Sequence, residues 1–357
     1  MARNPYVFVV GCGRSGTTLL QRMLDAHPCL AVTNEMDIGL KGFGHNHIRR
    51  WRNQIGLTHD GSVTATFVES LFDNWMFTRL SFDSAAVRQI ANARARVSYR
   101  DFVSRLFDLY AEMRGKELAG DKTPWYVRRI WGLHQLWPDA RFIHIMRDGR
   151  DVYQSMRSWR QANATSSGQG GAPDGPARLK DDPQGDVRYG DYLMSRFKTW
   201  EVDAVVTLAL WWKWTVLLGR QDGRMLGSNR YQEVLYEDLV GDPVRTSKTV
   251  CAFLEIPFSM EMIKFANGKT RADPRLSSKD RWLPPTPGLR DWRIEMSEDE
   301  MKRFEAVAGD LLRELGYERG ATKIPSATIE ITDSVAEMFV QDLRDKRAIV
   351  PTGLYGG

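Results

Sequence analysis

A glycine-rich turn near the amino terminus has the residue types of an anion-binding loop. Residues 11–18 read GCGRSGTT and follow a run of β-forming residues at 7–10. The three glycines permit positive φ angles and let backbone N–H groups approach a ligand without an intervening Cβ. Because a helix is expected to begin directly after the turn, its free N–H groups add to a concave site for an anion. We expect this loop to bind a phosphate group; the alternative is a tight turn without a ligand.

The same loop departs from the pattern of ATP-binding enzymes. Gly11, Gly16 and Thr18 have the spacing of G-x-x-x-x-G-K-[ST], but Thr17 stands where that pattern has lysine. The nearest cation is Arg14, inside the loop. An enzyme that uses ATP with magnesium is expected to have the lysine, so we expect a phosphate ligand other than ATP.

A second segment has the residues of a phosphate-binding strand end. Residues 141–146 read RFIHIM, a buried-type strand, and Arg147 follows at once within the run RDGRD. Ser155 comes eight residues after Arg147, in an expected helix. An arginine at the edge of a sheet offers a planar fork to a phosphate, and a hydroxyl one or two turns into the helix adds a donor. The alternative is an Arg/Asp-rich helix cap.

Three further polar residues follow expected strands. Glu35 comes after a short strand at 30–32, Lys122 lies in a turn after the strand that begins at Leu118, and Tyr236 follows the strand 231–235. Open α/β sheets place their ligands at the carboxyl ends of the strands. For Lys122 the alternative is a solvated turn lysine, and for Glu35 a capping role or a pair with Arg14.

The order of elements predicts the fold class. Strands alternate with helices, which favours an α/β fold with a P-loop-type parallel sheet covered by helices on both faces. We expect a long helix over 192–218 and a capped helix that begins at Ser297, with Glu300 completing a capping box. A single domain is expected over 1–322, with a mobile segment at about 164–186 and a tail of unknown role at 323–357.

The composition limits the classes of partner and the cellular location that we expect for the protein. The chain has 357 residues, and 50 Lys and Arg against 45 Asp and Glu give a net charge of +5, which suits small anionic ligands better than nucleic acid. Cys12, Cys29 and Cys251 give neither a disulfide framework nor a metal-ligand spacing. The apolar stretch 202–212 is too short to span a bilayer. No signal peptide is visible, so we expect a cytoplasmic protein.

The two phosphate motifs together resemble a known family. Residues 13–19, GRSGTTL, are similar to the 5′-phosphosulfate-binding loop of sulfotransferases that use 3′-phosphoadenylyl sulfate (PAPS). The segment from Arg147 to Ser155 resembles their 3′-phosphate-binding segment. Residues 23–28, MLDAHP, with Asn34 and Glu35 shortly after, are similar to the tyrosylprotein sulfotransferases and their bacterial relatives.

The resemblance implies roles for individual residues. It makes Glu35 the general base, with Asp37, His45 and His47 as rivals, while Arg14 and Lys122 neutralise charge on the transferring group. The residues it assigns to binding PAPS are Gly13, Arg14, Ser15, Gly16, Thr17, Thr18, Arg147, Ser155, Tyr236, Ser277, Ser278 and Arg290.

The chain departs from the family's pattern in two places. The tyrosylprotein enzymes have an arginine twelve residues after the first one, but this chain has Trp159 there, so Arg157 or Arg160 would have to substitute. The loop 268–292 resembles the family's cofactor-covering loop, with Arg290 in the place of a glycine.

The sequence predicts a sulfotransferase that moves a sulfuryl group from PAPS to an acceptor hydroxyl by in-line transfer, without a metal. The acceptor could be a small molecule, a carbohydrate, a lipid or a peptide, and a homodimer is one option. Two other functions stay open: a P-loop kinase or ATPase, and a non-catalytic nucleotide-binding protein on the same fold.

Overall fold

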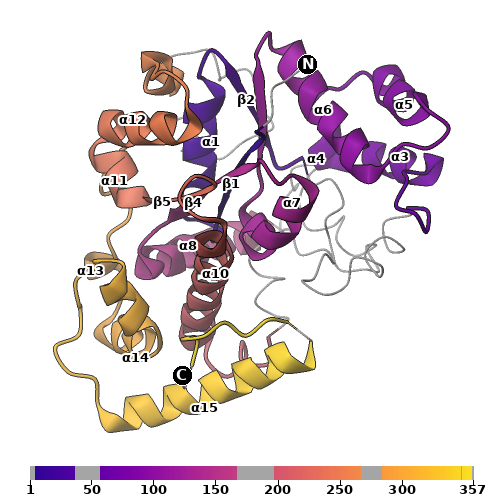
Figure 1. Ribbon diagram of the computed structural model, residues 1–357. Helices are drawn as coiled ribbons and strands as arrows, with labels where there is room; N and C mark the ends of the chain where they lie inside the picture. The colour runs from indigo at the N-terminus through magenta and orange to yellow at the C-terminus, as the bar shows by residue number, and fades with distance from the viewer. Residues whose placement is uncertain (1–4, 37–56, 167–196, 267–283, 347, 356–357) are drawn as a thin grey trace. The chain divides into compact units, whose positions relative to one another are not determined.

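Five strands form one parallel sheet in the order β2-β3-β1-β4-β5, in a computed structural model of the chain (Figure 1). The structure describes residues 5–36, 57–166, 197–266, 284–346 and 348–355. The central strand pairs with β3 on one side and β4 on the other, in parallel register. The predicted α/β class with a parallel sheet is therefore confirmed. The strands are β1 Val7–Gly11, β2 Leu30–Asn34, β3 Leu118–Lys122, β4 Arg141–Met146 and β5 Tyr231–Leu235.

The described chain divides into two compact units. The first takes its residues from 1–12, 16–146 and 219–287, and the second from 13–15, 147–218 and 288–357. The sheet lies in the first unit. The predicted domain boundary between 322 and 323 stays a prediction.

Successive side chains of a strand point to opposite faces of the sheet. Helices cover both faces, so the side chains on each face are buried. Phe8 and Val10 join the core beneath α6, and Val7 and Val9 join the core beneath α1 and α12 (Figure 1). The helices of this unit are α1 Thr17–Asp25, α3 Ala65–Phe72, α4 Trp75–Thr78, α5 Ser84–Asn92, α6 Tyr99–Met113, α7 Ile130–Leu136, α11 Tyr236–Gly241 and α12 Pro243–Leu254, with the 3₁₀ helices η1 Pro124–Arg129, η3 Met260–Met262 and η4 Lys264–Ala266.

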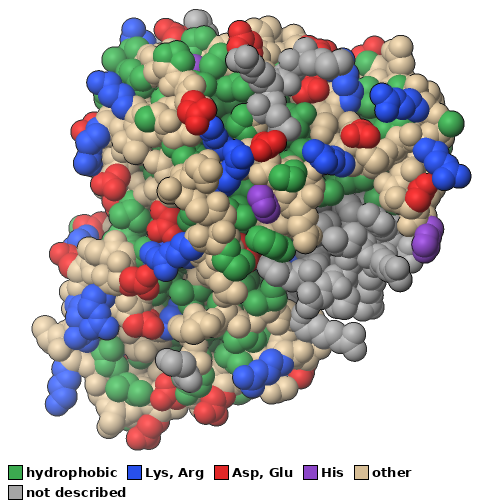
Figure 2. Space-filling model, in the orientation of Figure 1, with side chains coloured by type: hydrophobic (Ala, Val, Ile, Leu, Met, Phe, Trp, Pro, Cys, Tyr) green, Lys and Arg blue, Asp and Glu red, His purple; other side chains and the backbone are tan. Residues whose placement is uncertain are grey.

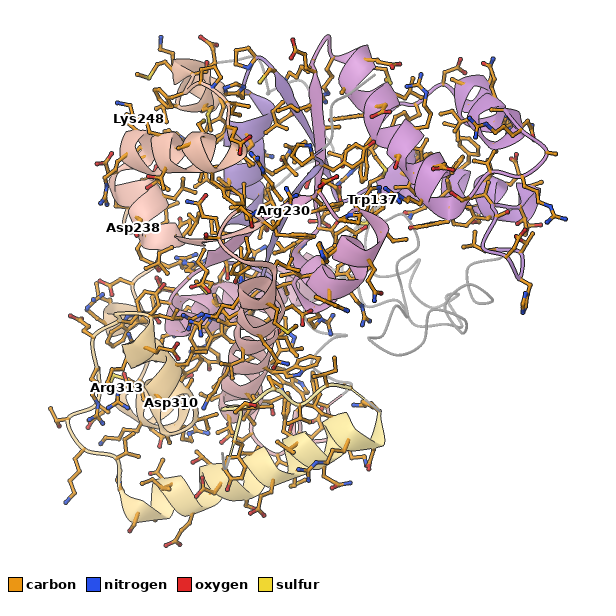
Figure 3. All side chains as sticks on the ribbon, viewed as in Figure 1. Trp137, Arg230, Asp238, Lys248, Asp310 and Arg313 are labelled. Carbon is orange, nitrogen blue, oxygen red and sulfur yellow. The ribbon has the colours of Figure 1, made fainter. Side chains whose placement is uncertain are left out.

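Aromatic side chains form the core on the α6 side. Trp137, which follows α7, is fully buried, and its ring lies 5.6 Å from that of Phe8 and 5.8 Å from that of Phe107 (Figure 3). The indole N–H donates to the hydroxyl of Ser104 at 2.9 Å. A buried indole needs such a partner, so the ring contributes its apolar area without leaving a donor unpaired.

The second unit is helical. It contains α8 Gly149–Ser166, α13 Trp292–Glu295, α14 Glu298–Glu314, α15 Ser326–Asp345 and the part of α10 (Ala204–Leu226) that ends at Leu218. The capping box predicted for Ser297 and Glu300 is present at the start of α14. One side of α15 is buried, and Phe339 on that side stacks on Phe197 with ring centroids 4.5 Å apart.

A buried arginine holds the second unit together. Arg150 is completely buried, and its guanidinium donates two hydrogen bonds to Asp148, at 2.7 and 3.0 Å, and one to Glu305 at 2.6 Å. Its guanidinium also lies over the ring of Trp292, 3.6 Å from the centroid. Because every charge in this cluster has a partner, α8 and α14 are joined without an uncompensated buried ion.

The long helix does not have the predicted bounds. α10 begins at Ala204, and the carboxylate of Asp203 caps it by accepting from the N–H of Val206 at 3.0 Å. Trp200 therefore precedes the helix, and the helix continues past Leu218 to Leu226. The expectation of a helix over 192–218 was wrong at both ends: residues 197–203 are not helical, because the helix starts after the capping aspartate, and the helix ends at Leu226. Residues 192–196 lie outside the described residues.

The visible face of the molecule carries Lys and Arg side chains interspersed with Asp and Glu (Figure 2). Among the described residues, no helix combines the length and the apolar character needed to cross a membrane.

Candidate functional site

The polar residues singled out in the sequence follow the carboxyl ends of all five strands. The glycine-rich loop follows β1, Glu35 follows β2 by one residue, Lys122 ends β3, Arg147 follows β4 and Tyr236 follows β5. Parallel α/β sheets bind their ligands at this edge. The strands of the fold therefore place these residues where a ligand site is expected.

The backbone of the glycine-rich loop needs glycine at position 16. Gly16 has a φ of 88° and caps the amino terminus of α1. A Cβ at this position would overlap the ring of Tyr236. Arg14 also has a positive φ, 71°. The loop is thus held in a conformation that L-residues rarely adopt, and its open N–H groups suit an anion.

Within the loop, Cys12 and Ser15 are both completely buried. Burial raises the pKa of the Cys12 thiol, which favours a packing role over that of a nucleophile. The Oγ of Ser15 has no hydrogen-bond partner among the described residues. An unpartnered buried hydroxyl is uncommon, and here it lies inside the proposed anion site.

Arg14 connects the loop to α8. Its Nε donates to the hydroxyl of Ser155 at 3.0 Å. The two phosphate motifs predicted from the sequence therefore meet in the second unit, through one cation and one hydroxyl. On the other side of the loop, Gly13 faces the indole ring of Trp211, on α10.

Arg147 is buried and held from two sides. Its guanidinium donates to the carboxylate of Asp151 at 3.3 Å, and its backbone carbonyl accepts from the indole N–H of Trp212 at 3.2 Å. Asp151 also accepts from the N–H of Trp292 at 3.0 Å. The pKa of Asp151 is raised by burial, against the effect of Arg147. Asp151, which the sequence reasoning missed, thus links Arg147 to the start of α13.

Lys122 and Glu35 form an ion pair in the first unit. The ammonium Nζ of Lys122 lies 2.5 Å from Oε1 of Glu35 and 3.3 Å from the hydroxyl of Thr18, the residue that follows Thr17 in α1. The Lys122 side chain is completely buried, whereas that of Glu35 is 29% exposed. Burial lowers the pKa of Lys122, and Glu35 opposes this shift. A cation and an accessible carboxylate therefore lie beside one end of the loop.

Two of the predicted cations pair with glutamates, and several other predicted residues lie outside the described part of the chain. Arg290 donates to Glu295 at 3.1 Å, and Arg157, one of the two candidate substitutes, donates to Glu300 at 3.0 Å. Arg160 lies in α8, and its side chain is not among those that the structure describes. The residues that lie outside the described part of the chain are Asp37, His45, His47, Ser277 and Ser278.

Asp121 is a second residue that the sequence reasoning missed. It precedes Lys122 on β3, is completely buried and accepts hydrogen bonds from Thr33, Met36 and Thr123. Burial raises the pKa of this carboxyl, and its three donors oppose the shift. The available signal was a carboxylate inside an otherwise buried strand, since such a group is almost always paired.

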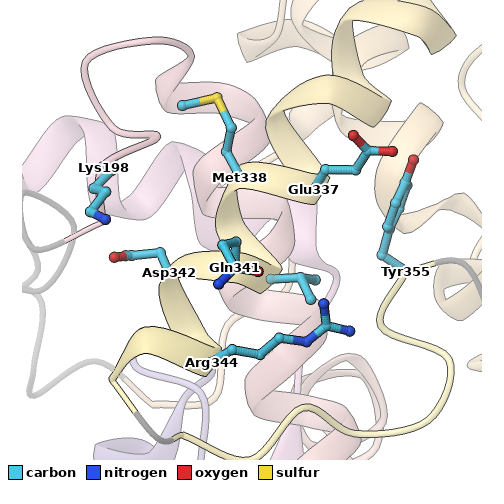
Figure 4. Close-up of a pocket in the computed structure, with 8 residues that line it drawn as sticks. Lys198, Glu337, Met338, Gln341, Asp342, Arg344 and Tyr355 are labelled. Atoms are coloured by element: carbon cyan, nitrogen blue, oxygen red, sulfur yellow. The ribbon is translucent and has the colours of Figure 1, made fainter.

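A hollow lies in the second unit, beside α15. Its cavity volume is about 720 Å³, and it is lined by side chains that include Lys198, Glu337, Asp342 and Arg344 (Figure 4). Lys198 pairs with Asp345 at 3.2 Å. Among the residues that the structure describes, none of those predicted to bind or react lines it. Elsewhere in the described chain, no group of three or more His, Cys, Asp or Glu side chains is arranged to hold a metal ion.

The arrangement around the sheet agrees with a comparison against protein families. The model described as the sulfotransferase family matches residues 5–260, which include β1 to β5 and all the strand-end residues described above. The chain belongs to the sulfotransferase family. The resemblance drawn from the glycine-rich loop and the segment 147–155 is thereby confirmed.

This sulfotransferase-family protein is similar to several curated proteins. It is 28% identical over 324 residues to the nodulation protein NoeE of Sinorhizobium fredii, covering 87% of this chain and 66% of that protein. It is 22% identical over 330 residues to protein-tyrosine sulfotransferase A of Caenorhabditis elegans, covering 89% and 68%. The chain thus spans about two thirds of the length of these relatives. Human carbohydrate sulfotransferase 2 is 36% identical over 92 residues, 25% of this chain and 17% of that protein.

Solved sulfotransferase structures are also similar. The sulfotransferase domain of the Synechococcus PCC 7002 olefin synthase has a TM-score of 0.49 and 20% identity, covering 94% of this chain and 95% of that chain. Mouse sulfotransferase SULT7A1, solved in complex with PAP, has a TM-score of 0.40 and 14% identity, covering 94% and 89%.

Proposed function

We propose that this protein transfers a sulfuryl group from PAPS to an acceptor hydroxyl. The observation that carries the proposal is the contact between Lys122 and Glu35 at the carboxyl edge of the sheet. Lys122 is a buried cation that can neutralise charge on the transferring group, and Glu35 is a partly exposed carboxylate that can accept a proton. In-line sulfuryl transfer to a hydroxyl requires both.

The loop residues fit an anionic donor. Ser15 has a buried hydroxyl without a partner among the described residues, and Gly16 caps α1 with a positive φ and no side chain, so no side chain of the cap occupies the N–H groups of the first helical turn. We assign the 5′-phosphosulfate to residues 13–18, including Thr17 and Thr18, and the 3′-phosphate to Arg147 and Ser155. Tyr236 and Arg290, with Ser277 and Ser278, complete the assignment made from the sequence.

Each residue has a distinct task in the reaction. PAPS supplies the sulfuryl group, and the bond between its sulfur and the 5′-phosphate oxygen breaks to release adenosine 3′,5′-bisphosphate. Glu35 takes the proton of the acceptor hydroxyl as the new O–S bond forms. Lys122 and Arg14 hold positive charge where negative charge accumulates, and their fixed contacts with Glu35 and Ser155 keep both in place before the reaction.

The acceptor belongs to one of four classes: a small molecule, a carbohydrate, a lipid or a peptide. The names of the relatives include a protein-tyrosine and a carbohydrate sulfotransferase. A cytoplasmic location and a homodimer stay predictions from the sequence.

One observation favours a P-loop kinase or ATPase as the second candidate. Lys122 lies 3.3 Å from the hydroxyl of Thr18 and so brings a lysine to the loop from another strand. A kinase of this kind would bind ATP with magnesium, whereas the proposed sulfotransferase binds adenosine 3′,5′-bisphosphate.

A titration separates the two candidates. We expect adenosine 3′,5′-bisphosphate to raise the melting temperature, with a gain of about 2.7 kcal/mol in stability at a hundredfold excess over Kd, and ATP with magnesium to have little effect. Arg147→Ala should abolish the shift, while Arg245→Ala, which changes an exposed arginine of α12, should retain it. Stabilisation by ATP with magnesium alone would make the kinase the better assignment.

A further inference from the structure

Asp121 directly precedes Lys122 on β3, and its carboxylate is buried beside the residues that flank Glu35. Its side chain is 0% exposed. One carboxylate oxygen accepts from the hydroxyl of Thr123 at 2.7 Å, and the other accepts from the hydroxyl of Thr33 and from the backbone N–H of Met36 at 3.1 Å. Because both oxygens are occupied and the side chain has no access to solvent, Asp121 cannot itself contact an acceptor.

Two of the three residues that donate to Asp121 flank Glu35 in the sequence. Thr33 lies two residues before it and Met36 directly after it. Glu35 has a φ of 61°, a left-handed conformation that is uncommon and unfavourable for a residue other than glycine. Its own N–H donates to the carbonyl of Lys122 at 2.8 Å, and the next N–H along the chain donates to Asp121. Lys122 and Asp121, which are adjacent on β3, thus accept from the adjacent backbone amides of Glu35 and Met36.

A left-handed residue persists only where its surroundings fix it. We propose that Asp121 is a positioning residue that holds Glu35 in the left-handed conformation and so keeps its carboxylate against Lys122. The inference deepens the proposed function and rests on it, since it concerns the placement of the proposed base. Asp121 acts through the backbone of the turn and has no contact with the reacting atoms.

Removal of Asp121 takes the acceptor from the Met36 amide and from the Thr123 hydroxyl, while the Thr33 hydroxyl keeps only the carbonyl of Gly120 at 3.2 Å. The turn then relaxes toward a negative φ at Glu35, which moves the carboxylate away from the ammonium of Lys122. A displacement of about 1 Å in a catalytic group lowers turnover roughly 100-fold. Among the described residues, the hydrogen-bond partners of the Asp121 carboxylate are Thr33, Met36 and Thr123 and none belongs to the loop 13–18, so affinity for the bisphosphate should be kept.

The test compares Asp121→Ala and Asp121→Asn with Asp108→Asn. Asparagine keeps one carbonyl oxygen that can accept from Met36, whereas alanine keeps none. Asp108 is a matched control, because it is also buried in the first unit and accepts from the hydroxyl of Tyr6 at 3.1 Å. The measurements are kcat and KM for sulfuryl transfer, Kd for adenosine 3′,5′-bisphosphate, and Tm.

We expect kcat to fall roughly 100-fold in Asp121→Ala and less in Asp121→Asn, with Kd unchanged within about twofold. Asp108→Asn should lower Tm and leave kcat unchanged. If the Asp121 variants lose no more activity than Asp108→Asn at a similar loss of Tm, the positioning role is overturned. Asp121→Asn keeps the test available if the alanine variant does not fold.

Crystal structures of wild type and Asp121→Ala, the variant that leaves the Met36 amide without any acceptor at this position, give a readout that does not depend on activity. We expect the φ of Glu35 to become negative, or its carboxylate to leave Lys122, in the variant. An unchanged turn with an intact ion pair would overturn the inference. A wild-type protein that transfers no sulfuryl group would instead refute the proposed function, and the crystallographic comparison would still decide the role of Asp121.

Discussion

Arg14 and Ser155 are 141 residues apart in the chain, yet Nε of the arginine donates to the hydroxyl of the serine at 3.0 Å. One residue belongs to the glycine-rich loop and the other to α8, and each was expected from the sequence to bind a phosphate. Their contact joins the two motifs in one unit of the structure. The hydroxyl therefore orients the arginine before any ligand arrives.

The serine should matter for nucleotide affinity. Ser155→Ala removes a donor to phosphate and the hydroxyl that orients Arg14, so Kd for adenosine 3′,5′-bisphosphate should rise about tenfold, or about 1.4 kcal/mol. Isothermal titration calorimetry measures this change. Ser158→Ala, on the same helix, is the matched control and should leave Kd unaltered. Equal affinities for wild type and Ser155→Ala would remove Ser155 from the binding site.

Lys122 should set the alkaline limit of turnover. Burial lowers its pKa, so in the folded protein the ammonium loses its proton below the ordinary lysine value of about 10.4. Above that pH the cation that neutralises the transferring group is lost. We expect kcat to fall on the alkaline side at a pH below about 10.4, in a pH–rate profile from neutral pH upward.

Lys122→Arg is the control for this assignment. A guanidinium stays charged throughout that range, so the alkaline fall in kcat should move to higher pH even if the variant is slower. An unchanged alkaline limb in this variant would assign the titration to another group.

The lowered pKa of Lys122 also affects the free energy of unfolding, with a defined sign. The folded state releases the proton at a lower pH than the unfolded state does, so stability rises with pH between the folded pKa of Lys122 and about 10.4.

Two glycines with positive φ allow the cost of backbone strain to be measured apart from the cost of steric overlap. Gly16 has a φ of 88° and faces the ring of Tyr236, whereas Gly115 has a φ of 64° and open space around its Cβ position. Alanine at Gly115 should cost about 1 kcal/mol of unfolding free energy. Alanine at Gly16 should cost more and also weaken bisphosphate binding, because the ring of Tyr236 must move. Chemical denaturation of both variants measures the difference, and equal costs would show that the ring yields freely.

Local patterns in the sequence were enough to predict the sheet and its edge. Residues 141–146 and 231–235 form strands with the predicted bounds, because apolar runs that end in charged turn residues are typical of buried parallel strands. The capping box at Ser297 and Glu300 was likewise readable, since its two contacts lie three residues apart.

Contacts between distant segments could not be read in this way. Nothing near Asp121 in the sequence shows that β2 pairs with β3 and brings Thr33 and Met36 to its carboxylate. The left-handed φ of Glu35 follows from those contacts and from no local preference of glutamate. The start of α10 at Ala204 depends on the capping role of Asp203, within a stretch whose apolar pattern alone predicted an earlier start.

The most direct test of the account is sulfuryl transfer itself. The measurement is the release of adenosine 3′,5′-bisphosphate from PAPS in the presence of phenolic, carbohydrate, lipid and peptide acceptors, with wild type and Glu35→Gln. We expect acceptor-dependent release by wild type and a kcat lower by about 10²–10⁴-fold in Glu35→Gln, with bisphosphate affinity kept. Glu69→Gln, which changes an exposed carboxylate of α3, should behave as wild type. Equal turnover in wild type and Glu35→Gln, or phosphoryl transfer from ATP in place of sulfuryl transfer, would contradict the account.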